Sequence, residues 1–174
     1  MHIEVKDCPD VHFVQLIEKS IEYYAERLIP DKRTRNGVTI YVTFEKDLNV
    51  EAHCSIHDYN SRKKPRLFDI EMNSNLGSRR ILSTLAHEMV HIKQYIAGEL
   101  NETMTAWKGK RIDPDSLDYY DHPWEIEAYG KEQGLLSGLV TKYKLYDILS
   151  DLNNPDAAIE FRPIAWKTNE REIR

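Results

Sequence analysis

The sequence predicts an α+β fold in which a small, mostly antiparallel sheet packs on a central helix, with further helices at the N-terminal and C-terminal sides. Two kinds of periodicity indicate this class. Residues 10–28 and 81–96 repeat apolar side chains at intervals of three and four, which is typical of amphipathic helices. Residues 37–44, 50–59 and 67–72 alternate apolar with polar side chains, as half-buried strands do. Such strands can bury their apolar face against a helix that follows them.

The first helix is expected over residues 10–28, with Pro9 or Asp10 near its start and Pro30 just after its end. No side chain on it calls for chemistry, so we interpret it as scaffold. The three strands follow, and a turn over residues 73–77 leads into the central helix, which Gly98 suits as an end.

The central helix contains the motif H-E-x-x-H at residues 87–91. Positions i and i+4 of an α-helix lie one turn apart on the same face, so His87 and His91 can direct two imidazoles at one point. Two neutral nitrogens suit a Zn²⁺ ion, and the carboxylate of Glu88 suits a proton acceptor for a water bound there. The apolar residues lie on the opposite face. Because two ordinary surface histidines can produce the same pentapeptide, a third ligand is needed to support a metal site.

Residues 122–132, HPWEIEAYGKE, predict another helix, with Pro123 in its first turn. Glu125 and Glu127 are separated by about 200° around a helix, so only one of them can reach the metal. His122 is a third candidate. Residues 135–152 predict a further amphipathic helix with a break at Ser137-Gly138, and a tail begins near Pro155.

Composition narrows the class of protein. A chain of 174 residues with 41% hydrophobic residues is consistent with one globular domain spanning residues 1–174. The net charge of −5 argues against a dedicated nucleic-acid binder, so we interpret the basic runs at residues 62–66 and 108–111 as solvated loops. Two cysteines are too few for a disulfide framework, and neither a signal peptide nor a membrane span is visible. We therefore expect a cytoplasmic setting, in a cell or a virus-infected host.

The helix motif followed by a glutamate on a later helix resembles the gluzincin class of zinc peptidases, whose third ligand lies in the pattern E-x-x-A/S-D/N. Residues 125–129, EIEAY, match this pattern with Glu125 as the ligand and Ala128 three positions later. Tyr129 stands where the class has an acidic or amide residue that orients a ligand histidine.

Residues 87–129 more closely resemble small phage and bacterial metallopeptidases described as SprT-like or minimal gluzincins. The matching segments are LAHEMVHIKQ, GEL, WKGK and PWEIEA. The resemblance implies a zincin-like fold and a zinc peptidase acting on a peptide or protein substrate, with His87, His91 and Glu125 as ligands and Glu88 as general base. SprT-type domains use a third histidine, which keeps His122 open as a ligand. The resemblance also suggests that the strand at residues 67–72 is an edge on which an extended peptide pairs.

Two other functions stay open at this point. The chain could be a catalytically silent zinc-binding module, regulatory or virion-associated, or a SprT-like protease acting on nucleic-acid-associated proteins. A peptidase also needs a hydrogen-bond donor for the developing oxyanion besides the metal. The candidates are Tyr119, Tyr120, Tyr129 and His122.

Overall fold

The structure is a computed structural model, and it describes residues 1–146. Along the chain the elements are β1 (His2–Lys6), α1 (Val11–Leu28), α2 (Lys32–Asn36), β2 (Thr39–Glu45), β3 (Ala52–Tyr59), β4 (Pro65–Asn73), α3 (Ser78–Ala97), β5 (Ala106–Trp107), β6 (Lys110–Arg111), η1 (Pro114–Ser116), η2 (Tyr119–Asp121) and α4 (Pro123–Tyr143). The α+β class is confirmed, and the three predicted strands and the central helix lie within two residues of their expected bounds.

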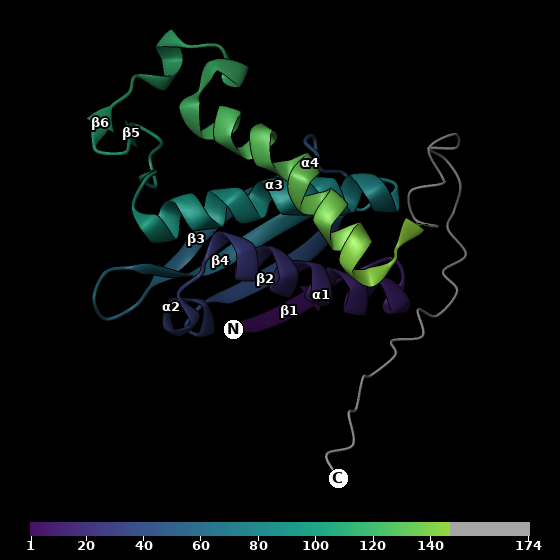
Figure 1. Ribbon diagram of the computed structural model, residues 1–174. Coiled ribbons are helices and arrows are strands. Elements are labelled where there is room, and N and C mark those ends of the chain that lie inside the picture. The colour runs from purple at the N-terminus through teal and green to yellow at the C-terminus, as the bar shows by residue number, and fades with distance from the viewer. Residues whose placement is uncertain (147–174) are drawn as a thin grey trace.

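The main sheet has the strand order β1-β2-β4-β3 (Figure 1). β1 runs parallel to β2, β2 runs parallel to β4, and only β3 and β4 form an antiparallel pair. The prediction of a mostly antiparallel sheet is therefore wrong, and the sheet is mixed. The N-terminal strand β1 was not expected, and α1 carries the chain back so that β2 enters the sheet parallel to β1. The prediction that residues 67–72 form an edge strand is also wrong, because β4 lies between β2 and β3. The edges of the sheet are β1 and β3.

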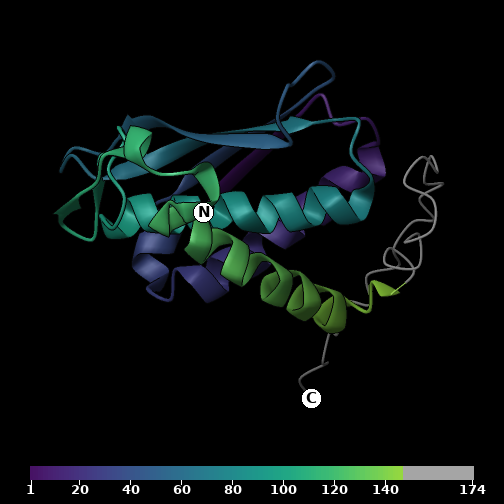
Figure 2. The same cartoon turned by 90° about the horizontal axis from the view of Figure 1, so that it is seen from above.

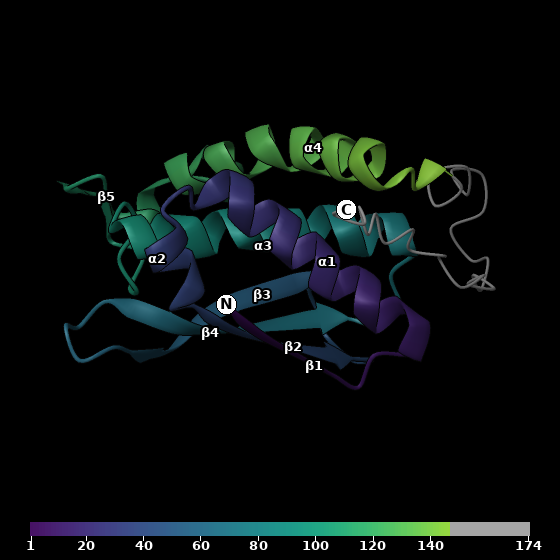
Figure 3. The ribbon, with the colours of Figure 1, turned by 60° about the horizontal axis from the view of Figure 1, so that its bottom comes forward.

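One face of the sheet is apolar because the register of β2 and β4 places the inward-facing apolar residues of the two strands side by side. Ile40 pairs with Phe68, and Val42 pairs with Ile70, and all four side chains are fully buried. Helices α1 and α3 cover this face, while the other face of the sheet has no helix on it within residues 1–146 (Figure 3). The hydrophobic core thus lies between the sheet and this helix pair.

Helix α3 is the centre of the molecule. The sheet packs on one side of it and α4 on the other (Figure 2). Its predicted apolar stripe faces the core, and its histidine side is buried as well, because α4 covers it. Gly98 ends the helix as expected, with a φ of 69° that glycine adopts without steric cost.

Helix α4 runs without interruption from Pro123 to Tyr143, so the predicted break at Ser137-Gly138 is wrong. Gly138 instead allows α4 to approach α1 closely, because a Cβ at this position would collide with the Tyr23 hydroxyl. Residues 147–152 of the predicted last helix, and the tail near Pro155, lie outside the described residues. Among residues 1–146, no helix combines the length and the apolar character that a membrane span requires.

Candidate metal centre

Two neighbouring helices supply the candidate ligands. His87 and His91 lie one turn apart on α3, and Glu125 lies in the first turn of α4, which begins at Pro123. The two helices pack side by side (Figures 1 and 2). All three side chains are buried, with at most 8% of the residue surface exposed.

The two Nε2 atoms and the carboxylate group of Glu125 form a compact triangle. The Nε2 atoms of His87 and His91 are 3.1 Å apart, and His87 Nε2 lies 3.1 Å from Glu125 Oε2. His91 Nε2 lies 3.5 Å from Glu125 Oε1. A tetrahedral ion with metal–ligand bonds of about 2.0–2.1 Å places its ligand atoms roughly 3.3 Å apart. The spacing of the triangle is therefore compatible with a small tetrahedral metal ion.

The second nitrogen of each ring has its own acceptor. His87 Nδ1 lies 3.2 Å from Glu132 Oε2, and His91 Nδ1 lies 2.9 Å from Gln94 Oε1. An acceptor at Nδ1 holds the ring proton there, so Nε2 of each neutral imidazole carries a lone pair. Both lone pairs then point at the same place as the Glu125 carboxylate.

The orientation of Gln94 follows from its surroundings. Its Nε2 atom donates to the backbone oxygen of Trp124 at 3.0 Å and to Glu127 Oε2 at 3.1 Å. Both partners are acceptors, so the amide nitrogen faces them and the amide oxygen faces His91. Lys93 and Lys131 in turn bind Glu127, at 3.1 Å and 2.7 Å. Glu127 therefore supports the histidine through Gln94 and does not belong to the triangle.

Three electron-pair donors that converge within 4.8 Å need a positive charge between them. Without a metal, one proton has to be shared. Burial alone would lower the pKa of His91, but the hydrogen bond to Glu125 and the nearby carboxylates raise it overall. Burial alone would raise the pKa of Glu125, but His87 and His91 outweigh it and lower that pKa to about 2. The two histidines thus favour the ionised form of the Glu125 carboxylate.

Glu88 lies between two cavities that open beside the triangle. The larger, of about 370 Å³, is also lined by His87, Arg80 and Tyr129. The smaller, of about 180 Å³, is also lined by His91 and Glu125. Burial raises the pKa of Glu88, and the two histidines partly offset that increase. The Glu88 carboxylate therefore lies beside the ligand histidines and lines both cavities.

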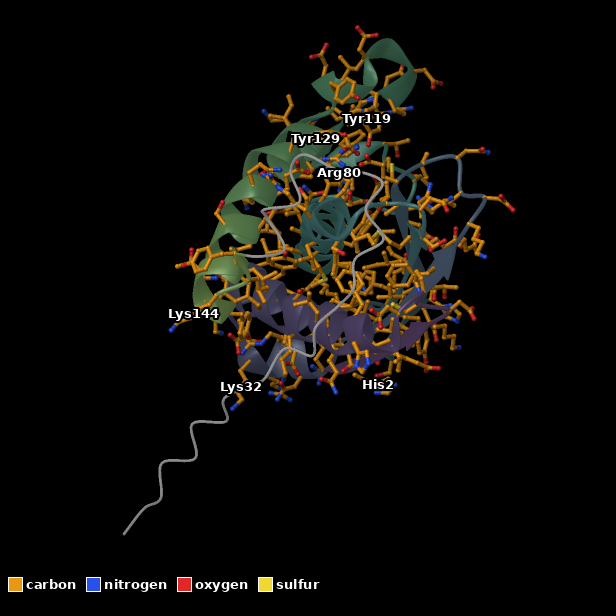
Figure 4. The ribbon with its side chains drawn as sticks, turned by 90° about the vertical axis from the view of Figure 1, so that its right-hand side faces the viewer. His2, Lys32, Arg80, Tyr119, Tyr129 and Lys144 are labelled. Carbon is orange, nitrogen blue, oxygen red and sulfur yellow. The ribbon has the colours of Figure 1, made fainter. Side chains whose placement is uncertain are left out.

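The other candidates from the sequence are three tyrosines and His122, and all of them line one or both cavities outside the triangle. Tyr119 lines both cavities, Tyr120 and Tyr129 line the larger, and Tyr119, Tyr129 and Arg80 gather on one side of α3 (Figure 4). Burial, the charge of Glu125 and hydrogen bonds to Glu125 and Tyr129 raise the pKa of Tyr119. His122 lines the smaller cavity, but it stacks on Trp124 and its Nε2 lies 3.0 Å from the Pro114 carbonyl oxygen, outside the triangle.

Sequence reasoning missed two residues at this centre, Glu132 and Gln94. Glu132 lies seven residues after Glu125, which places it two turns farther along the same face of α4. That spacing was a usable signal for an acceptor on the same face of α4, and Glu132 lies beside His87 Nδ1. Gln94 follows His91 by three residues, which also puts the two on one face of α3.

Neither basic run lines the two cavities. Residues 62–64 lie in the turn between β3 and β4, and residues 108–111 form the turn and the second strand of the β5–β6 hairpin. Comparisons with protein-family models, with curated proteins and with solved structures give no match for this chain. The function therefore has to be inferred from the geometry of the site.

Proposed function

We propose that this protein is a zinc-dependent peptidase that hydrolyses peptide bonds in a peptide or protein substrate. One observation carries the proposal: His87, His91 and Glu125 present three ligand atoms within 4.8 Å of one another, beside the buried carboxylate of Glu88. Two imidazole nitrogens and one carboxylate oxygen are a donor set that suits zinc.

A zinc ion held by His87, His91 and Glu125 would lower the pKa of a bound water towards neutral pH and would polarise a carbonyl oxygen. The protein residues do the rest. Glu88 accepts a proton from the attacking water and delivers it to the leaving amine. Tyr119, which lines both cavities, is the best-placed phenol for donating a hydrogen bond to the oxyanion.

The main alternative is a module that binds zinc without catalysis. Such a module has no need for Glu88, and burying this carboxylate beside the ligands costs free energy. It also has no need for two cavities next to the ligands, because structural zinc sites are closed by a fourth protein ligand.

The test is Glu88→Gln, an isosteric change that removes the proton acceptor and keeps the three ligands. We expect the purified variant to bind one zinc per chain, by elemental analysis, and to have the same unfolding midpoint as the wild type. Hydrolysis of denatured casein should fall by at least about 100-fold, as is typical for loss of a general base. The matched control is Glu22→Gln, which makes the same change at an exposed residue on α1.

Unchanged casein hydrolysis in Glu88→Gln would remove the general-base role. A wild-type protein that binds zinc but cleaves neither casein nor a peptide library would favour the silent module. Failure of the wild type to bind zinc would contradict both the peptidase and the silent zinc-binding module.

A further inference from the structure

Exposed apolar side chains gather around the larger cavity. Nine large apolar residues are exposed in residues 1–146, and four of them line this cavity: Val50, Tyr119, Tyr120 and Tyr129. Tyr119 and Tyr129 lie on the same side of α3 as Arg80 (Figure 4). Single exposed apolar residues are common, but a group of them at one cavity marks a surface that another molecule covers.

The three tyrosines form one aromatic wall. The ring centroids of Tyr119 and Tyr120 are 5.2 Å apart, and those of Tyr120 and Tyr129 are 5.6 Å apart. Tyr120 is the most exposed of the three, at 69% of its surface. The face of a tyrosine ring attracts lysine and arginine, because its π-electrons carry negative charge. The wall therefore favours a ligand that is positively charged.

The charged residues that line the cavity are mostly acidic, and they are Glu51, Glu88, Glu132 and Arg80. Arg80 is already paired, because its Nε atom donates to Glu51 Oε1 at 2.7 Å and its Nη2 atom binds the same carboxylate. Glu88 and Glu132 are buried, with 5% and 7% of their surface exposed, and no lysine or arginine pairs with either of them within residues 1–146. An incoming cation would stabilise the ionised form of both carboxyl groups.

The segment that leads to the aromatic wall is acidic as well. Residues 113–121, DPDSLDYYD, which we call the acidic rim, contain four exposed aspartates, and none of these forms an ion pair within the described part of the chain. Lys108, Lys110 and Arg111 precede the rim, but none of them lines the cavity. A cleft bordered by one sign of charge concentrates ligands of the opposite sign.

The larger cavity has the volume that a long side chain needs. It measures about 370 Å³. For comparison, a cavity of about 150 Å³ holds one benzene ring. An extended lysine or arginine side chain therefore fits, with its apolar stem along the tyrosines and its charged end near the glutamates.

We propose that the larger cavity and its acidic rim bind a lysine or arginine side chain of a polypeptide segment, which the three tyrosines and the carboxylates recognise by its charge. The inference rests on the proposed function for its meaning, because it names the substrate class: a polypeptide with a basic residue close to the bond that is cleaved. The binding itself needs no metal, so it can be measured apart from hydrolysis.

Fluorescence anisotropy of labelled peptides tests the surface. The peptides are acetylated and amidated glycine-serine repeats interrupted by lysine, arginine, norleucine or glutamate. With the zinc-loaded and the zinc-free protein alike, the lysine and arginine peptides should bind about tenfold more tightly than the norleucine peptide, and the glutamate peptide should bind most weakly. Raising the salt from about 0.05 M to about 0.5 M should reduce that preference to about twofold. Equal affinity for the lysine and norleucine peptides would overturn the proposal.

The ion pair inside the cavity gives two variants with opposite expected effects. Glu51→Gln leaves the Arg80 charge unpaired, so the affinity for the lysine peptide should fall about fivefold, whereas Arg80→Gln frees the Glu51 carboxylate and should raise it about fivefold. The matched controls are Glu22→Gln and Lys19→Gln, which make the same charge changes in an exposed ion pair on α1. Equal effects in the two pairs of variants would assign the binding to net charge and overturn the cavity as its site.

A second pair of variants tests the aromatic wall. Tyr120→Leu removes the ring and should weaken the lysine peptide about fivefold, whereas Tyr120→Phe keeps the ring face and should stay within about twofold of the wild type. The control is Tyr146→Leu, which makes the same change at an exposed tyrosine that does not line the cavity. Unchanged binding in Tyr120→Leu would overturn the role of the wall.

A further peptide distinguishes the source of the cation. A glycine-serine peptide with a free amino terminus and no lysine should bind no more tightly than the norleucine peptide. If it binds as tightly as the acetylated lysine peptide, the cavity recognises a terminal ammonium group, and the assignment to a side chain is wrong.

The outcomes separate the two proposals. Lysine-selective binding without any peptide hydrolysis would retain the cationic surface and reject the peptidase. Hydrolysis of casein with unselective peptide binding would retain the peptidase and reject the cationic surface.

Discussion

The Nδ1 atom of His87 lies 3.2 Å from the Oε2 atom of Glu132, which α4 presents two turns beyond Glu125. One helix thus supplies both a candidate ligand and the carboxylate that holds another ligand in place. An acceptor at Nδ1 favours the tautomer that carries its proton there, which frees the Nε2 lone pair of His87 for a metal ion.

Glu132→Ala should weaken zinc binding by about 10- to 100-fold, because the His87 ring loses its orienting acceptor. Glu132→Gln keeps an oxygen acceptor at nearly the same place and should recover part of that loss. Competition with a chromophoric chelator measures both dissociation constants. The control is Glu26→Ala, an exposed glutamate on α1. Equal affinity in wild type and Glu132→Ala would show that His87 needs no partner.

Glu125→Ala should abolish tight zinc binding, because it removes one corner of the ligand triangle. Glu127→Ala should leave one zinc bound per chain and reduce the affinity only moderately, because Glu127 acts through Gln94. Elemental analysis after dialysis distinguishes the two variants. Equal zinc content in both would contradict the assignment of Glu125.

Gln94→Leu should lower the free energy of unfolding by about 3 kcal/mol, because it leaves buried polar partners without hydrogen bonds. The partners are the Trp124 carbonyl, the Glu127 carboxylate and the His91 ring. Urea unfolding of the metal-free protein measures the loss independently of zinc. Gln15→Leu, an exposed position on α1, should change stability by no more than about 0.5 kcal/mol. A similarly small change for Gln94→Leu would contradict the network.

Gly138→Ala should destabilise the fold by about 1–3 kcal/mol, because the added methyl group overpacks the contact between α4 and α1. Gly130→Ala and Gly134→Ala lie on the same helix with open space around them, and each should stabilise by about 0.5–1 kcal/mol. Thermal unfolding compares the three variants.

The Tyr23 hydroxyl, which is buried and has no hydrogen-bond partner within residues 1–146, is the atom in the way. Tyr23→Phe should therefore rescue Gly138→Ala. A loss of stability that persists in the double variant would place the clash elsewhere.

The sequence predicted the elements that depend on local pattern. The alternation in β2, β3 and β4, the apolar repeat of α3 and its end at Gly98 all appear in the structure. The order of the strands was not predictable in this way, because pairing joins residues far apart in the chain. The short strand β1 has only five residues, and its neighbour β2 begins more than thirty residues later.

By itself, the sequence determined that His87 and His91 share one face of a helix with Glu88 beside them, because helical geometry depends only on spacing along the chain. Only the tertiary structure decided that Glu125, and neither Glu127 nor His122, completes the triangle, because the packing of α4 on α3 selects which face of α4 meets the histidines. The same packing brings in Glu132, whose role depends on a contact between side chains that are forty-five positions apart.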